Sequence, residues 1–328
     1  MSSNKAVILF NLGGPETLAD VRPFLYNLFA DPDIIRIKNS ILRKSLAWFI
    51  ATTRQRKSRN LYRQIGGGSP LRRITQGQAD ALAARLEARG IPCRVYVAMR
   101  CWKPTIDDAV EQLKRDNITR AVALPLFPQF SFTTTGSCFN YFRRVLEKKA
   151  LAWKIEVSYV DAWYDEPRYI QAMAGLVRDA MSRFSAKDPA WIHLLYSAHS
   201  IPARYVEEES DPYLTQTQKT VEKINESLGH LSPSTLAFQS KVGPVKWLGP
   251  STDEILREMG RKGIRNVLAI PISFVSDHIE TLQEIDILYR RLAAKSGIAE
   301  FQRAASLNLD PTFIEALADI AQRALGHR

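Results

Sequence analysis

Short apolar runs alternate along the chain with longer amphipathic stretches. Most of the apolar runs are rich in valine, isoleucine, leucine, alanine or aromatic residues and predict β-strands, at 6–12, 94–99, 121–126, 155–160, 192–196, 235–239 and 267–274. Helical periodicity marks longer stretches between them, including 77–89, 105–116, 169–183 and 251–262. This alternation predicts parallel sheets covered by helices on both faces. In such sheets, ligands bind beyond the carboxyl ends of the strands.

A weak internal repeat relates the two halves of the chain. Trp102–Asp108 resembles Trp247–Glu254, and from Pro104 and Pro250 onward the two copies keep a constant offset of 146 residues. Each copy contains a turn, a helix, a strand and a proline in the same order, which indicates a duplicated mononucleotide-fold unit.

We therefore predict an α/β protein with two similar Rossmann-like domains. Each is expected to hold a parallel sheet flanked by helices, with the active-site cleft between the two domains. The predicted N-terminal domain comprises 1–145 plus 303–328, and it carries the ligand-binding lip. The predicted C-terminal domain comprises 146–302.

Two short segments carry the candidate chemistry. His199 stands where an apolar strand ends, and Asp277, Glu280 and Glu284 are spaced three and four residues apart at the start of a predicted helix. That spacing places the three carboxylates on one helical face. Carboxylates stacked in this way repel one another, which favours a site that binds a cation or transfers protons. The alternative is a solvated helix in which Asp277 is the N-cap and Glu280 completes a capping box.

Composition narrows the class of protein. The chain has 328 residues, of which 45% are hydrophobic and 24% are charged, as in ordinary globular proteins. No apolar run approaches the roughly 20 residues of a membrane span, and no signal peptide is recognised, so we expect a cytoplasmic protein. The three cysteines are widely spaced and odd in number, which argues against a disulfide framework, a zinc site or a four-cysteine iron–sulfur cluster.

The net charge of +11 is concentrated between residues 36 and 63, where basic residues alternate with bulky apolar ones. This mixture suits an anionic membrane surface or an amphiphilic anionic ligand, and we expect peripheral membrane contact through 41–50. A solvated basic helix is the alternative. We predict no nucleic-acid partner, because no DNA- or RNA-binding motif accompanies the charge. The glycines at 66–68 are not followed by the Gly-Lys-Ser/Thr of a phosphate loop, which disfavours nucleotide binding.

A series of motifs identifies a family. In order along the chain they lie at 11–17, 62–71, 124–131, 134–137, 197–199, 211–213, 238–244 and 276–282. Together they resemble ferrochelatases from near residue 6 to about residue 310. The resemblance implies a chelatase-like fold and a metal-inserting lyase of haem biosynthesis. Ferrochelatases insert Fe²⁺ into protoporphyrin IX, or into coproporphyrin III in some bacteria, and two pyrrole protons must leave as the metal enters.

The resemblance also implies roles for the candidate residues. His199 matches the family's essential histidine, and an imidazole can both hold a proton near neutral pH and ligate Fe²⁺. Glu280 matches the essential glutamate, and Glu284 extends an acidic metal path, so His199, Glu280 and Glu284 are the metal candidates. Asp277 and His278 complete the catalytic set, with His278 orienting the acidic residues. The division of base and metal-ligand roles between His199 and Glu280 stays open.

Porphyrin-binding candidates lie mainly in the N-terminal half. Positions that match propionate-binding groups are Arg54, Lys57, Tyr62 and Ser69, and the remaining substrate-binding candidates are Leu12, Arg100 and Trp247. Arginine and lysine gain charge-assisted hydrogen bonds from carboxylates. The alternative for the basic pair is a solvated face.

The chain departs from the family pattern at three positions. Leu288 stands where many members continue the acidic line with another glutamate, which puts the outer end of the metal path in doubt. Cys101 and Phe127 replace frequent tyrosines, so two hydroxyls near the porphyrin are missing.

The resemblance implies ferrous iron and a porphyrin as substrates. We predict no permanently bound cofactor and no iron–sulfur cluster, and we expect a cytoplasmic protein with possible peripheral association with the inner membrane. The leading prediction is protohaem formation from protoporphyrin IX. The alternatives are a coproporphyrin III ferrochelatase, a related chelatase that acts on a more reduced tetrapyrrole, and a non-catalytic haem or porphyrin carrier.

Overall fold

The computed structural model describes residues 4–243 and 245–326. Pro244, the last residue of the motif at 238–244, and the two chain ends lie outside the described residues. The chain divides into two compact units, Met1–Trp163 with Ile314–Arg328, and Tyr164–Phe313. Each unit contains a four-stranded, fully parallel sheet flanked by helices, which confirms the predicted α/β class.

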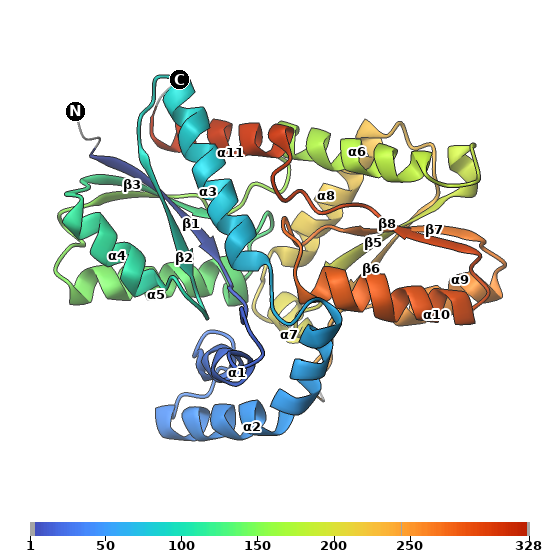
Figure 1. Ribbon diagram of the computed structural model, residues 1–328, viewed down its shortest axis with the longest axis horizontal. Helices are drawn as coiled ribbons and strands as arrows, with labels where there is room; N and C mark the ends of the chain where they lie inside the picture. The colour runs from blue at the N-terminus through green and yellow to red at the C-terminus, as the bar shows by residue number, and fades with distance from the viewer. Residues whose placement is uncertain (1–3, 244, 327–328) are drawn as a thin grey trace. The chain divides into compact units, whose positions relative to one another are not determined.

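The sheet of the first unit has the strand order β2-β1-β3-β4. Its strands are β1 (Lys5–Asn11), β2 (Arg94–Met99), β3 (Arg120–Pro125) and β4 (Glu156–Tyr159). Its helices are α1 (Val21–Ala30), α2 (Ser40–Gln64), α3 (Leu71–Ala88), α4 (Ile106–Arg115), the wide-turned π-helix η1 (Phe132–Gly136), α5 (Ser137–Lys148) and most of α11 (Pro311–Ala324). Figure 1 traces these elements along the chain.

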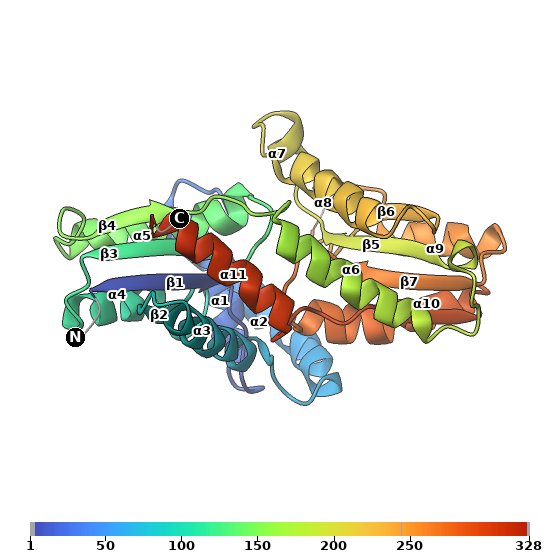
Figure 2. The same ribbon diagram turned by 90° about the horizontal axis from the view of Figure 1, so that it is seen from above.

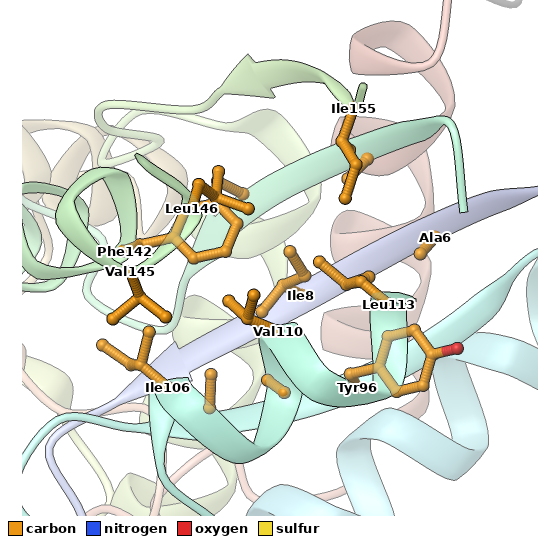
Figure 3. Packing of buried hydrophobic residues seen from close by; sticks show 14 of the residues in the cluster. Ala6, Ile8, Tyr96, Ile106, Val110, Leu113, Phe142, Val145, Leu146 and Ile155 are labelled. Atoms are coloured by element: carbon orange, nitrogen blue, oxygen red, sulfur yellow. The ribbon is translucent and has the colours of Figure 1, made fainter. Parts of the chain in front are cut away.

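The core of the first unit lies where α4 and α5 pack on one face of the sheet. Side chains of Ile106 and Val110 from α4, and of Phe142 and Leu146 from α5, gather over Ile8 of β1 (Figure 3). Residues 6–10 of β1 are fully buried, as expected for a central parallel strand covered on both faces.

A partly buried arginine joins two helices of the same unit. Arg89, which follows α3, contacts Glu315 and Asp319 of α11, with 2.8 Å between Arg89 Nη1 and Asp319 Oδ1.

The glycine motif at 66–68 also has a structural cause. A Cβ on Gly68 would lie 2.0 Å from the carbonyl oxygen of Glu16, so only glycine fits where these two loops meet.

The sheet of the second unit has the corresponding order, β6-β5-β7-β8. Its strands are β5 (His193–His199), β6 (Ser234–Gln239), β7 (Asn266–Pro271) and β8 (Glu300–Arg303). Its helices are α6 (Pro167–Ser182), the 3₁₀ turn η2 (Pro189–Trp191), α7 (Ala203–Glu207), α8 (Tyr213–Ser227), α9 (Thr252–Arg261), the π-helix η3 (Glu280–Tyr289) and α10 (Arg290–Lys295). Side chains from α9, η3 and α10 form the core on one face of this sheet, and α6 lies along the other (Figure 2).

The two units repeat each other in detail. Helices α4 and α9, and strands β3 and β7, keep the offset of 146 residues found in the sequence. Pro104 and Pro250 both follow cis peptide bonds, and both helices begin with a capping box. A π-helix follows the third strand in each unit. The internal repeat is therefore a repeat of whole elements.

The unit boundaries differ from the predicted ones at 145/146 and 302/303. The first lies later because β4 pairs with β3, which keeps the chain up to Trp163 in the first unit. The second lies later because β8 pairs with β7 and contacts η3, and the loop after β8 contacts the segment just before η3. The sequence analysis did not predict β8, which has only four residues and includes Glu300, Gln302 and Arg303.

Candidate active site

The candidate chemistry gathers at the carboxyl end of the second sheet. His199 ends β5, Gln239 ends β6, and η3 follows the loop after β7. Because β6 and β7 pair on opposite sides of β5, the end of β5 is a topological switch point, where open parallel sheets bind their ligands.

The central contact joins the two leading sequence candidates. His199 Nδ1 lies 2.9 Å from Glu280 Oε2, and the two side chains are 36% and 22% exposed. Burial alone would lower the pKa of His199, but the charge and hydrogen bond of Glu280 outweigh burial and raise it. Burial opposes ionisation of Glu280, yet His199 lowers the pKa of Glu280 to about 2. The pair therefore favours an imidazolium beside a carboxylate.

Neighbouring groups fix the backbone of His199. Its N–H donates to Ser273 Oγ at 3.2 Å, and its carbonyl accepts from Tyr213 Oη at 2.8 Å. Tyr213 Oη also lies 2.6 Å from Ser273 Oγ. The backbone of His199 is therefore held at the strand end by its own hydrogen bonds, and the ring is left to contact Glu280.

The carboxylate of Glu284 is fixed by several hydrogen bonds. It accepts hydrogen bonds from the backbone N–H and the hydroxyl of Ser240, from Gln239 Nε2 at 3.3 Å and from Tyr289 Oη at 2.9 Å. Burial and the nearby charge of Glu280 raise the pKa of Glu284. The two glutamates thus have pKa values displaced in opposite directions, an arrangement typical of sites that transfer protons. The part of Glu284 in iron delivery stays a prediction.

His278 has a defined tautomer. Its Nδ1 lies 3.1 Å from the carbonyl oxygen of Ser276, which can only accept, so Nδ1 carries the proton. Burial lowers the pKa of His278, which leaves Nε2 as an acceptor 3.9 Å from Glu280 Oε2. The ring also packs against Phe274, with 4.2 Å between ring centroids. His278 therefore lies beside Glu280 without a hydrogen bond from its Nε2 to that carboxylate, and its role in orienting the acidic group stays a prediction.

Asp277 does not stand on the helix. The π-helix η3 begins at Glu280, with Ile279 at its N-cap position, and the described residues form no side-chain cap or capping box there. The prediction of three carboxylates on one helical face is therefore wrong for Asp277, and so is the alternative of a capped, solvated helix. The cause is tertiary, because the Asp277 carboxylate is bound by Arg303, Thr281, Ser306 and Asn308.

The propionate-binding candidates occupy α2 and the loop after it. Arg54 and Lys57 are at least partly exposed, and the Arg54 guanidinium lies over the ring of Phe29. Tyr62 is buried, at 6% exposure, and Ser69 Oγ accepts from the backbone N–H of Leu71. Arg54 and Lys57 are thus the more accessible of the four. Their binding role stays a prediction.

The remaining substrate-binding candidates have different surroundings. Arg100 forms a buried ion pair with Asp31 at 2.9 Å and donates to Ser137, so its guanidinium is already engaged within the first unit. Leu12 follows β1 and is partly buried. Trp247 in the second unit is also partly buried, and its Nε1 has no hydrogen-bond partner among the described residues. A role in substrate binding is untested for all three.

Sequence reasoning assigned no role to the residues that hold the site. Tyr213 and Gln239 lie within motifs at 211–213 and 238–244, so the motif matches were the signal that could have found them. Ser273, Tyr289 and Arg303 had no such signal. Among residues 4–243 and 245–326, no three histidine, cysteine or acidic side chains converge as metal ligands.

Comparison with solved structures defines the class of fold. The chain is similar to "SirB from Bacillus subtilis with Fe3+", with a TM-score of 0.55 and 14% identity, covering 98% of this chain and 95% of that one. It is equally similar to the sirohydrochlorin chelatase SirB of Bacillus subtilis subspecies spizizenii in complex with cobalt, at a TM-score of 0.55 and 11% identity over the same shares. The two Rossmann-like units therefore have the chelatase fold.

Sequence comparison then identifies the family. The ferrochelatase family pattern matches residues 4–325. Curated ferrochelatases from Synechococcus sp. (strain JA-3-3Ab) and Gloeobacter violaceus (strain ATCC 29082 / PCC 7421) are 51% and 48% identical to the chain, each covering 98% of it and 93% and 97% of the relatives. The chain belongs to the ferrochelatase family. It is an enzyme of haem synthesis whose substrates are a porphyrin and ferrous iron.

Proposed function

We propose that this ferrochelatase inserts Fe²⁺ into protoporphyrin IX to form protohaem, with release of two protons. The observation that supports the insertion chemistry is the contact of 2.9 Å between His199 and Glu280 at the carboxyl end of β5. A porphyrin must lose two pyrrole protons as the metal binds, and this pair offers a base together with the charge that stabilises its protonated form.

The geometry supports His199 as the base. Glu280 is ionised, so His199 Nδ1 donates to it, and above the raised pKa of His199 the ring is neutral and its Nε2 is the proton acceptor. When Nε2 takes a pyrrole proton, the imidazolium is held by the Glu280 carboxylate. His199 therefore acts as general base, and Glu280 stabilises the charge that forms.

Glu280 also suits the contact with iron. Its Oε2 lies between the donor Nδ1 of His199 and the acceptor Nε2 of His278. Two acceptors that face each other at 3.9 Å favour a cation or a proton between them. We propose that ferrous iron passes this carboxylate on its way to the macrocycle. The other coordination positions of the iron would be filled by water and by the porphyrin nitrogens.

An anaerobic insertion assay tests the function. Purified protein is mixed with Fe²⁺ and, in parallel, with protoporphyrin IX or coproporphyrin III. We expect loss of free-porphyrin fluorescence and growth of a haem spectrum, faster with protoporphyrin IX. Faster turnover of coproporphyrin III would reassign the substrate. Haem binding without insertion above background would instead establish a carrier and refute the enzyme assignment.

We also propose that the protein holds no iron–sulfur cluster. The sequence has three widely spaced cysteines, Cys93, Cys101 and Cys138, whereas the common clusters are held by four cysteine thiolates. The protein purified for the insertion assay should accordingly show no cluster absorption. A visible cluster spectrum with matching iron and sulfide would contradict this.

We further propose peripheral membrane contact through the first half of α2. Ile41, Leu42, Trp48 and Phe49 are 55% to 76% exposed. The whole of α2 contains seven basic and no acidic residues. No helix in the described part of the chain has the length and apolarity to cross a bilayer. A basic helix with exposed aromatic residues is suited to lie on an anionic surface.

Vesicle flotation checks the membrane proposal. The protein should float with vesicles rich in anionic lipid at low salt and much less with neutral vesicles. The double variant Trp48→Ser with Phe49→Ser should lose most of this binding, because it removes the apolar contact and keeps the charge. Trp191→Ser, which removes a 71% exposed tryptophan on η2, is the matched control and should float normally. If the double variant floats as well as the wild-type protein, the first half of α2 is not the membrane-binding surface.

A further inference from the structure

Arg303 lies between two carboxylates that flank Glu280 in the sequence. Arg303 is the last residue of β8, and its Nε and Nη2 donate to the two oxygens of Asp286 at 3.0 and 2.9 Å. Its Nη1 lies 3.1 Å from Asp277 Oδ1, and the Arg303 side chain is 11% exposed. Asp277 precedes η3, whereas Asp286 lies within it. One buried guanidinium thus ties the entry and the middle of the helix that carries Glu280 to the edge strand of the sheet.

Asp277 is fully engaged in holding this entry. Its carboxylate accepts from Thr281 Oγ1 at 3.0 Å, Ser306 Oγ at 2.9 Å and Asn308 Nδ2 at 2.8 Å, besides Arg303. Its backbone N–H donates to Asn308 Oδ1 at 2.9 Å. Burial opposes ionisation, but Arg303 and these donors outweigh it and lower the pKa of Asp277. A carboxylate with four side-chain donors holds structure and is a poor metal ligand or proton acceptor.

The corresponding place in the first unit lacks these charges. The offset of 146 residues sets Ser131 against Asp277 and Asn140 against Asp286. Arg303 pairs with Ala269 in the same register in which Tyr159 pairs with Ala123, so Tyr159 stands in the place of Arg303. The two carboxylates and the arginine are thus present together in the copy that carries Glu280.

We propose that Arg303 and Asp277 are positioning residues, forming an ionic clamp with Asp286 that sets the Glu280 carboxylate against His199. The clamp acts on both sides of Glu280, since it holds the chain just before η3 at Asp277 and the helix itself at Asp286. Arg303 bonds two carboxylates at once through a planar fork of donors, a geometry that lysine cannot reproduce. The expected effect of the clamp on kcat rests on the proposed function. Its expected effect on the pKa of His199 does not.

Two variants and two readouts test the clamp. Arg303→Lys keeps the charge but cannot bridge both carboxylates, and Asp277→Asn keeps the shape but removes one charge. With η3 loosened, Glu280 withdraws from His199, and the pKa of His199 falls. NMR titration of the histidine ring protons measures this in the free protein, with the His199 signal assigned by its loss in His199→Ala. In the insertion assay, kcat should fall roughly 10- to 100-fold with little change in the KM for porphyrin.

Arg89→Lys is the matched control. Arg89 is also an arginine between two carboxylates, but it is only partly buried and joins α3 to α11 in the first unit. This variant should lower the melting temperature without moving the His199 titration. If Arg303→Lys does not fold, the test rests on Asp277→Asn, because this variant removes a charge and keeps the atoms in place. An unchanged His199 titration in the folded variants would overturn the proposal whatever happens to kcat, and failure of the wild-type protein to insert iron would overturn only the proposed function.

Discussion

Replacing His199 with alanine should abolish most iron insertion and leave the fold intact. The variant loses the imidazole whose Nε2 is assigned the pyrrole protons, and a positioned general base contributes roughly 10²- to 10⁴-fold to a rate. We therefore expect kcat for haem formation to fall by that factor. The fold should persist because the backbone of His199, not its ring, makes the hydrogen bonds with Ser273 and Tyr213.

A second histidine on the same strand provides the control. His193 begins β5, and its Nε2 lies 2.8 Å from Thr235 Oγ1, at the end of the strand opposite to His199. His193→Ala should insert iron at nearly the wild-type rate. Circular dichroism melting of both variants checks the fold, and near-normal turnover by a folded His199→Ala would refute the assigned base.

Replacing Glu280 with glutamine should change both the rate and its pH dependence. Glutamine keeps the size of the side chain and an oxygen that can accept from His199 Nδ1, but it carries no charge. The imidazolium that forms during insertion loses its counter-charge, and loss of one such preorganised group costs roughly 10²- to 10³-fold in kcat. We expect a decrease of that size at the pH optimum.

The direction of the pH shift follows from the pKa of His199. In the wild-type protein Glu280 raises this pKa, so activity falls as the pH decreases through a value above the ordinary 6.5. Without the charge of Glu280, burial lowers the pKa, and the acidic limb of the rate profile should move to lower pH. The profile of kcat/KM from pH 5 to 9 measures this, and an acidic limb that stays in place would show that His199 is not the titrating base.

The thermal stability of the protein gives a second measure of the interaction between the Glu280 charge and His199. The raised pKa of His199 stabilises the fold fully below 6.5, and this contribution is lost as the pH rises through the folded pKa. The lowered pKa of Glu280 stabilises the fold above 4.5, and that contribution is lost as the pH falls towards about 2. The difference in melting temperature between wild type and Glu280→Gln should be largest between these two ordinary values. Glu258→Gln, which removes an exposed carboxylate paired with Lys262, controls for net charge.

The sequence alone determined the architecture and the family. Parallel strands buried on both faces must be apolar, so the seven predicted strands were found within two residues at most ends. The repeat at an offset of 146 predicted two similar units because duplicated elements keep their spacing. His199 and Glu280 were recognisable because the motifs that carry them lie at strand and helix ends, and the structure brings the two within 2.9 Å.

Only the tertiary structure decided how the acidic segment is held. The spacing of Asp277, Glu280 and Glu284 predicted one helical face, since periodicity counts residues along a single element. The structure removes Asp277 from that face because Arg303, Ser306 and Asn308, more than twenty-five residues later in the chain, bind its carboxylate. It likewise fixes Glu284 through Ser240 and Gln239 of another strand end. Hydrogen bonds between distant segments leave no periodic trace in a single sequence, so the chemistry of this site could be located from the residues, but the assignment of its acidic groups required the fold.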